Sequence, residues 1–214
     1  MTQEGAEAFE LLDLSSVDTV LSTTRSVRRK LDLSRPVEPE VIYECINLST
    51  QAPMGLGGES WRFLVVTERE RKEKIAEIYK GLIMRLIEER GVPIKPTQHA
   101  LIERLPQMPA LIFVCIIGEP PGAEVSSQIG FYGSILPTAW SLMLALRSRN
   151  LGSTWTSVLA SQQTEIAEIL EVPDGVVQTV MFPVAYTKGA KLKRAERQDA
   201  RHLTYWNSWG NSDT

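Results

Sequence analysis

Apolar and polar positions alternate along the chain in two patterns, one typical of amphipathic helices and one typical of buried strands. Residues 68–90 place apolar side chains at helical spacing among many charged ones, which predicts a long amphipathic helix. Residues 110–117 form an uninterrupted apolar run bounded by Pro109 and Gly118, which predicts a strand buried on both faces. Both patterns recur elsewhere in the chain.

The same patterns, taken with their capping and turn residues, predict the remaining elements. Further helices are expected over residues 15–22, 40–48, 98–105, 127–149 and 164–170. Further strands are expected over residues 61–66, 153–158 and 176–186. Helices and strands alternate loosely, so the chain is expected to form an α+β or α/β domain.

The segment from Val125 to Leu146 carries no charged residue and is long enough to span a membrane. Its serines, glycines and glutamine make it only moderately apolar, and Pro137 lies within it. A helix that is apolar on nearly all sides also suits the centre of a globular domain. We therefore interpret residues 127–149 as a long central core helix and expect no membrane association.

Composition places the chain among ordinary globular proteins. Apolar residues make up 43% and charged residues 23% of its 214 residues, and no repeat or linker divides it. The net charge of -3 argues against nucleic acid or an anionic membrane as partner, because both attract an excess of basic charge. We expect residues 1–14 to be a mobile acidic segment and residues 15–214 to be a single domain. No secretory signal is visible, so a cytoplasmic location is expected.

Motifs for self-contained catalysis or for metal binding are missing from the sequence. The chain has no glycine-rich nucleotide loop, no serine-hydrolase elbow and no zinc-binding HExxH. Cys45 and Cys115 lie among apolar residues, which predicts inert buried thiols and no metal site. His99 and His202 are expected at the surface.

Two basic clusters are the clearest chemical feature that remains. The first covers residues 25–30 and the second residues 188–201. Guanidinium groups bind phosphate in a bidentate fork, so the two clusters together suit a phosphate ligand, and a solvated surface is the alternative. The hydroxyl and indole groups of residues 153–157 suit hydrogen bonding to, and stacking on, a planar heterocycle.

Four segments, in this order along the chain, carry a family resemblance. They are TRSVRRK at residues 24–30, APMGLGGESWRFLVV at 52–66, FYGSILPTAWSLMLALRSRNLGSTWT at 131–156 and KRAERQDARHLTYWNSWG at 193–210. With them, the chain resembles the nitroreductase-like family of FMN-dependent oxidoreductases. The resemblance implies an α+β fold of the three-layer α/β sandwich type, with a central mixed or antiparallel sheet flanked by helices and a long central helix.

The resemblance also implies a set of FMN-binding residues, with no catalytic side chain because the chemistry takes place at flavin N5. The residues that match contacts to the phosphate and ribityl chain are Arg25, Ser26, Arg28 and Arg197. The residues that match the segments around the flavin ring are Gly57, Glu59, Pro137, Thr138, Trp155, Thr156 and Ser157. For Trp155, packing in the core is as compatible with the sequence as stacking on the flavin.

The glycine loop departs from the family pattern. Gly57, Glu59 and Ser60 stand where the family has asparagine, glutamine and proline, and Asp199 stands where its tail has proline. An ionised carboxylate can only accept hydrogen bonds, so Glu59 would disfavour the reduced flavin if it pointed inward. In the alternative arrangement, the loop turns Glu59 to solvent and offers backbone N–H groups to the ring.

The activity implied by the resemblance is hydride transfer from NAD(P)H, through flavin N5, to a small organic acceptor such as a nitroaromatic or a quinone. The resemblance also implies a homodimer. Two alternatives remain open: a flavin enzyme of another reaction type, such as a dehalogenase or an ene-reductase, and a non-catalytic FMN-binding or redox-sensing protein.

Overall fold

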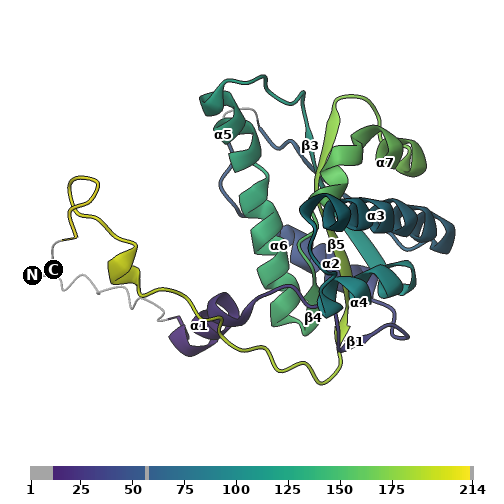
Figure 1. Ribbon diagram of the computed structural model, residues 1–214, viewed down its shortest axis with the longest axis horizontal. Helices are drawn as coiled ribbons and strands as arrows, with labels where there is room; N and C mark the ends of the chain where they lie inside the picture. The colour runs from purple at the N-terminus through teal and green to yellow at the C-terminus, as the bar shows by residue number, and fades with distance from the viewer. Residues whose placement is uncertain (1–11, 56–57, 213–214) are drawn as a thin grey trace, which may run out of the picture. The chain divides into compact units, whose positions relative to one another are not determined.

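A computed structural model describes residues 12–55 and 58–212 of the chain. These residues divide into two compact units. The larger unit comprises residues 24–191 and contains the whole sheet (Figure 1). The smaller unit combines the described residues before and after that range, with helix α1 (Leu14–Thr23) and the 3-10 turn η3 (Ala200–His202).

Helix α1 matches the helix predicted over residues 15–22. Asp13 caps its first turn, because one carboxylate oxygen accepts a hydrogen bond from the backbone N–H of Ser15 at 3.1 Å. Residues 1–11 of the predicted mobile segment lie outside the described residues. The single domain over residues 15–214 stays a prediction.

The larger unit is built on a five-stranded antiparallel sheet. Its strands are β1 (Leu31–Asp32), β2 (Trp61–Val66), β3 (Ala110–Ile117), β4 (Leu151–Ser153) and β5 (Val176–Thr187). The strand order is β1-β5-β3-β2, and β4 pairs with β5 beside this path. Strands β2 and β3 have the bounds predicted from their apolar runs, and β5 extends one residue past its predicted end.

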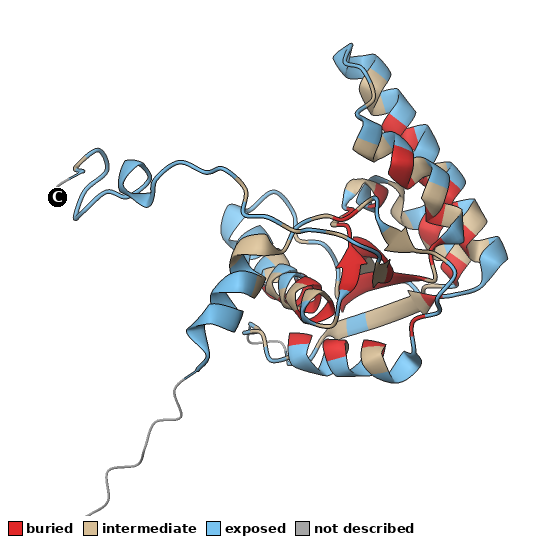
Figure 2. Cartoon of the chain, turned by 90° about the horizontal axis from the view of Figure 1, so that it is seen from below, coloured by how far each residue is buried: buried red, intermediate tan, exposed pale blue. Residues whose placement is uncertain are grey.

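Helices cover both faces of this sheet, which gives three layers (Figure 1). One face is covered by α2 (Pro39–Ser49) and α6 (Leu136–Ser148), and the other by α3 (Arg69–Arg90), α4 (Pro96–Arg104) and α7 (Gln163–Leu170). Figure 2 shows buried residues on the strands and on the helix sides that face them. The predicted α+β class, with a helix-flanked central sheet, is confirmed.

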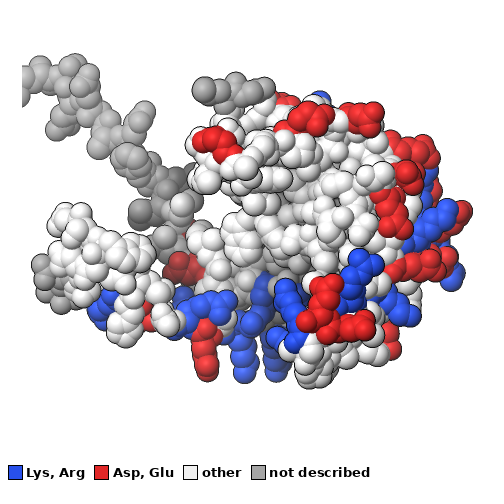
Figure 3. All heavy atoms as spheres, turned by 45° about the horizontal axis from the view of Figure 1, so that its top comes forward, with Lys and Arg blue, Asp and Glu red and all other residues white. Residues whose placement is uncertain are grey.

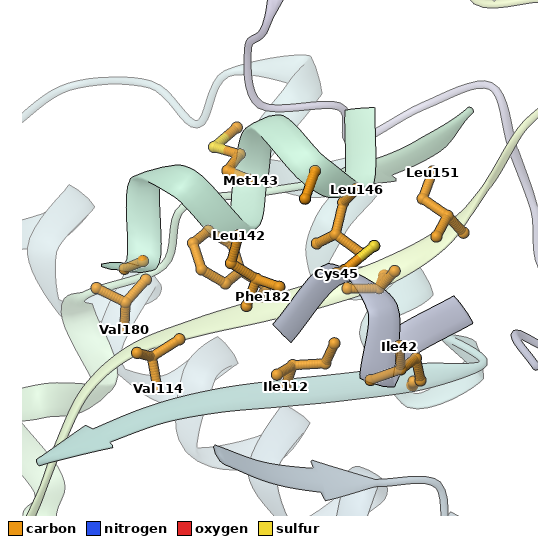
Figure 4. Packing of buried hydrophobic residues seen from close by; sticks show 14 of the residues in the cluster. Ile42, Cys45, Ile112, Val114, Leu142, Met143, Leu146, Leu151, Val180 and Phe182 are labelled. Atoms are coloured by element: carbon orange, nitrogen blue, oxygen red, sulfur yellow. The ribbon is translucent and has the colours of Figure 1, made fainter. Parts of the chain in front are cut away.

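The alternation of side chains along β3 divides the core into two clusters. Its even-numbered residues from 112 to 116 pack with α2 and α6, and its odd-numbered residues from 111 to 115 pack with α3, α4 and α7. Figure 4 shows the first cluster, where Cys45 of α2 lies beside Leu146 of α6. Cys45 and Cys115 are buried free thiols, as predicted. Burial raises the pKa of Cys115 to about 12, which keeps this thiol protonated and unreactive.

The predicted continuous helix over residues 127–149 is wrong, because the structure has two helices in this region. Helix α5 (Val125–Gly133) ends with Ser134 as its C-cap, and α6 starts afresh at Leu136. The cause is Pro137, which has no backbone N–H and would clash with the carbonyl four residues earlier in a continuous helix. Pro137 instead lies in the first turn of α6, a position that tolerates proline.

The helical stretch of residues 125–148 is the one candidate membrane span among the described residues, by length and composition alone. Helix α6 buries six residues, whereas α5 buries none. The interpretation as a core helix is therefore confirmed for α6, whereas α5 exposes Val125 and Ile129 and packs only Phe131 against the core.

The strand predicted over residues 153–158 begins and ends earlier than expected. Strand β4 covers Leu151–Ser153, and beyond it Thr156 forms only a single bridge with Met181 of β5. The chain then forms the 3-10 turn η2 (Val158–Gln162). Strand β1 was not predicted, because two residues are too few to produce a period.

Gly152 in β4 should be intolerant of even the smallest side chain. A Cβ at this position would lie 2.7 Å from Leu31 Cδ2 and 3.1 Å from both Val27 Cβ and Thr187 Cγ2. Gly152→Ala should therefore lower the free energy of unfolding by about 1–3 kcal/mol, measured by urea denaturation. Gly81→Ala is the matched control, since a Cβ in this mid-helix position meets nothing within 4 Å. The control should raise stability by about 0.5–1 kcal/mol, and equal effects of the two variants would contradict this packing.

Candidate functional site

The segment between α1 and β1 runs beside the segment that follows β4. The backbone N–H of Val27 donates to the carbonyl of Ser153 at 2.8 Å, and Thr154 Oγ1 donates to the carbonyl of Val27 at 3.0 Å. The backbone N–H of Trp155 donates to Ser26 Oγ at 3.3 Å, although these residues are 129 positions apart. The structure thus brings together two segments that were predicted to bind the cofactor.

The two basic clusters adjoin within the larger unit. The backbone N–H of Lys188 donates to the carbonyl of Lys30 at 2.7 Å, and Lys30 Nζ donates to the carbonyl of Gly189 at 3.3 Å. Figure 3 shows Lys and Arg side chains gathered along the lower edge of that view, with several acidic side chains among them, while other acidic side chains follow the upper edge. The exposed side chains of Arg25 and Arg29 belong to the first of these clusters. An anion approaching this surface would meet basic groups from both ends of the larger unit.

Arg28 lies in a different environment from its basic neighbours. Its side chain is half-buried, and its Nε is buried without a hydrogen-bond partner among the described residues. Arg104 of α4 donates from Nη1 to the carbonyl of Arg28 at 3.1 Å. Burial raises the pKa of Tyr79 in α3, and the charge of Arg28 partly offsets that rise. Arg28 therefore lies toward α3 and α4, with a guanidinium donor still unsatisfied.

The segment from Trp155 to Ser157 shows three different degrees of burial. The Trp155 ring is half-buried and packs edge-to-face against Phe182, with ring centroids 5.7 Å apart. Thr156 is buried and exchanges two backbone hydrogen bonds with Met181, at 2.9 and 3.2 Å. Ser157 is exposed. The packing supports the core role of Trp155, and its half-exposed ring leaves surface on which a planar ligand can stack.

The glycine loop is fastened to the junction between α5 and α6. Ser134 receives both contacts: its Oγ accepts from the backbone N–H of Gly55 at 3.2 Å, and its carbonyl accepts from Trp61 Nε1 at 2.9 Å. Trp61 is half-buried and packs against the cluster beneath α2 and α6. Glu59 is exposed, in the orientation that the second alternative for this loop requires. Gly57 lies outside the described residues.

Pro137 and Thr138 lie in the first turn of α6, directly after this junction. Pro137 is half-buried. Thr138 is fully buried, and its Oγ1 has no hydrogen-bond partner among the described residues. A buried hydroxyl without a partner is uncommon and costs about 1–3 kcal/mol. With Arg28 Nε, this is the second predicted cofactor residue that carries an unsatisfied polar atom.

Arg197 belongs to the smaller unit. Its side chain is exposed, and Nη1 donates to the carbonyl of Glu196 at 3.0 Å. Its convergence with Arg25 on one phosphate therefore stays a prediction. Among the described residues, no group of three or more His, Cys, Asp or Glu side chains is placed to hold a metal ion.

Ser134 and Arg104 are positioning residues that the sequence patterns did not reveal. Both take part in a bond to a backbone carbonyl, Ser134 by accepting from Trp61 and Arg104 by donating to Arg28, and Ser134 also accepts from Gly55 through its Oγ. Contacts to a backbone carbonyl place no demand on the type of residue that supplies it, so they leave no trace in the sequence. The helix break before Pro137 was the one available signal, since it frees carbonyls at the end of α5 for other donors.

The arrangement fits an FMN-sized ligand by the chemistry of its donors. It combines guanidinium and ammonium groups for a phosphate, a serine hydroxyl beside them, and a half-exposed indole for a planar ring. The two unsatisfied atoms, Arg28 Nε and Thr138 Oγ1, are of the kind that a polar ligand or ordered water would satisfy. No paired acid and base side chains accompany these groups, so the site suits cofactor-borne chemistry.

Comparison with known proteins shows which family this chain matches. A family model described as the nitroreductase family matches residues 21–186. A protein of Methanothermobacter thermautotrophicus, provisionally named NADH dehydrogenase/NAD(P)H nitroreductase, is 25% identical over 190 residues, covering 87% of this chain and 85% of its own. An iodotyrosine deiodinase of Thermotoga neapolitana is 22% identical over 175 residues, covering 81% of this chain and 90% of its own.

Solved structures share the fold. A crystal structure of oxidized iodotyrosine deiodinase bound to FMN and 3-iodo-L-tyrosine superposes with a TM-score of 0.69 at 20% identity, covering 89% of this chain and 98% of that one. A nitroreductase-like family protein from Bacillus cereus superposes with a TM-score of 0.66 at 19% identity, covering 92% of this chain and all of that one. At these identities, the likeness concerns the fold alone.

The contact between Trp61 and Ser134 should hold the glycine loop in place. Trp61→Phe keeps most of the ring but removes the N–H donor, which leaves the carbonyl of the buried Ser134 without this partner. We expect the free energy of unfolding to fall by about 1–3 kcal/mol, measured by chemical denaturation, and amide exchange in residues 58–60 to become faster. Trp209→Phe is the control, because Trp209 is 91% exposed and should change stability by less than about 0.5 kcal/mol. Equal losses for both variants would show that the hydrogen bond has no positioning role.

Proposed function

Because the chain belongs to the nitroreductase family, we propose that it is an FMN-dependent oxidoreductase that acts on a small organic molecule. The single observation that carries this proposal is the family match over residues 21–186, a range that contains all but one of the predicted FMN-binding residues. The contact between Ser26 and Trp155 supports it, because two of those residues come together in the fold.

In this proposal, side chains contact three parts of the cofactor: the phosphate with the ribityl chain, one side of the flavin ring, and the edge of the ring. Arg25 and Ser26 bind the phosphate and the ribityl chain, and Arg197 completes the phosphate site from the C-terminal segment. Trp155 packs its indole along one side of the flavin ring, and Pro137 at the start of α6 borders the ring edge. Each group binds or orients, and none of them exchanges a proton with the substrate.

The bound flavin would supply the redox chemistry, accepting hydride from NAD(P)H and delivering it to the second substrate. The use of NAD(P)H is supported by the name of the Methanothermobacter relative. Glu59 is exposed, so in our proposal backbone N–H groups of the glycine loop, rather than this carboxylate, contact the pyrimidine edge of the ring. Nitroaromatics and quinones are the acceptors that we propose first, in a cytoplasmic setting.

Reductive dehalogenation is the second candidate reaction. It is favoured by the deiodinase of Thermotoga neapolitana, which matches 81% of this chain, and by the shared fold of the FMN-bound deiodinase. In such a reaction, a halogenated aromatic compound takes up two electrons and a proton and releases halide. A non-catalytic FMN-binding protein is the third possibility, and it would bind flavin without accepting electrons from a nicotinamide.

We also propose that the protein is a homodimer. Helices α5 and α6 expose Val125, Ile129, Leu136 and Trp140, with Ile129 68% exposed. Apolar side chains this close together on neighbouring turns form a patch of the kind that protein interfaces cover. A second copy of the chain is the partner that the family resemblance implies for this patch.

The proposed activity is tested by the flavin of the purified protein. Denaturation should release FMN, and anaerobic addition of NADH or NADPH to the holoprotein should bleach its visible flavin band. Nitroaromatic, quinone and halogenated phenol acceptors should then be compared for their ability to restore the oxidised spectrum. Failure to bind FMN after soaking would overturn the proposal, and FMN that neither nucleotide reduces would favour the non-catalytic alternative.

The phosphate site should depend on particular arginines and not on the basic surface as a whole. Arg25→Ala and Arg197→Ala should each weaken FMN binding roughly tenfold to hundredfold, since a hydrogen bond to a charged group contributes about 1.5–3 kcal/mol. Arg29→Ala removes the same charge from an exposed neighbouring position and should change the affinity much less. Flavin fluorescence titration gives the three dissociation constants. Equal losses in all three variants would mean that the clusters act only as a diffuse positive field.

A further inference from the structure

A hollow lies between helix α7 and the start of β5, apart from the residues of the candidate cofactor site. Its volume is about 670 Å³, within the usual range for small-molecule sites. Three stretches line it: residues 118–120 after β3, residues of α7 from Gln163 to Glu168, and residues 171–178. None of the predicted FMN-binding residues that the structure describes belongs to this lining.

The lining of this hollow carries acidic groups and no basic side chain. Its four carboxylates are Glu119, Glu168, Glu171 and Asp174. Glu171 is neutralised by Arg71 of α3, whose Nη2 lies 2.7 Å from Glu171 Oε1. The other three form no ion pair with any described residue. The hollow therefore attracts cations.

Gln178, a residue of β5 that lines the hollow, carries a buried hydrogen-bond acceptor. In the sheet it pairs with Cys115, whose side chain packs on the α3 and α7 face, so Gln178 points toward the same face, beneath α7. Its residue is 5% exposed. Gln178 itself lines the hollow, and its Nε2 atom donates to the carbonyl of Val176, another lining residue, at 3.3 Å. The Oε1 atom is buried without a hydrogen-bond partner among the described residues.

The backbone of Gln178 is held in place by a neighbouring glutamine. Gln163, at the start of α7, donates from Nε2 to the carbonyl of Gln178 at 2.6 Å and accepts from its backbone N–H at 2.9 Å. The side-chain amide is restrained separately, by its burial and by the bond from Nε2 to Val176, and leaving its Oε1 unpaired costs about 1–3 kcal/mol. A ligand with an N–H donor would remove that cost.

We propose that this hollow binds a small organic ammonium compound, with one N–H donor on Gln178 Oε1 and its positive charge among Glu119, Glu168 and Asp174. A bare metal ion fits less well, because no group of three acidic, His or Cys side chains among the described residues is placed to coordinate one. A flexible primary amine can satisfy a buried acceptor and separated carboxylates at the same time, since an ammonium group has three donors.

The test uses 1,4-diaminobutane as the probe and follows the side-chain amide resonance of Gln178 by NMR during titration of the full chain. We expect saturable binding and a shift of that resonance. Tetramethylammonium, which has the charge but no N–H donor, should bind at least roughly tenfold more weakly, because one charge-assisted hydrogen bond is lost. Neutral 1,4-butanediol should bind more weakly as well.

Substitutions then separate a built site from general attraction to an acidic protein. Glu168→Gln and Asp174→Asn, both at exposed positions, should each weaken diamine binding several-fold, and Gln178→Leu should weaken it roughly tenfold. Glu89→Gln is the control, since it removes the same charge at the far end of α3. If Gln178→Leu does not fold, the two carboxylate variants decide the question. The proposal would be overturned if binding is absent, if the three substitutions in the hollow leave it unchanged, or if Glu89→Gln weakens it as much as they do.

Discussion

Strand β5 is the element on which the rest of the structure depends, because it pairs with three other strands. Near its end, Tyr186 pairs with Asp32 of β1 and also with Leu151 of β4. With β1 and β4 both held at this end of β5, Val27 exchanges hydrogen bonds with Ser153 and Thr154. These bonds place Ser26 against Trp155, and with them the two segments that we propose to hold the phosphate and the flavin ring.

The sheet also separates the candidate cofactor residues Trp155 and Pro137 from the acidic hollow. Side chains on one face form the cluster beneath α2 and α6, and the candidate cofactor residues Trp155 and Pro137 lie along this side. Gln178 points to the other face, beneath α7, where the acidic hollow opens. Because neighbouring residues of a strand point to opposite faces, β5 can contribute to both sites without either one disturbing the other.

The sequence predicted those parts of the structure that depend on local pattern. Strands β2 and β3 have their predicted bounds because an apolar run shows where a buried strand begins and ends. The prediction of a continuous central helix was wrong because it followed the apolar pattern of residues 125–148, whereas Pro137 indicated that a new helix begins there. The candidate site was located by family resemblance, and no local pattern revealed Ser134, Arg104 or the pairing of Ser26 with Trp155. Each of these contacts joins one side chain to the backbone of a residue far away in the sequence, and the type of the side chain does not show which distant backbone group it meets.

The central claim is that the strand pairing around β5 assembles the cofactor site from segments distant in sequence. Hydrogen–deuterium exchange of the protein with and without FMN tests it most directly, because each segment reports separately. The claim predicts that FMN slows exchange in residues 24–28, 134–139 and 153–157 together, while residues 163–178 around the acidic hollow remain unchanged. Slowing confined to one of the three segments, or appearing only around the hollow, would contradict it.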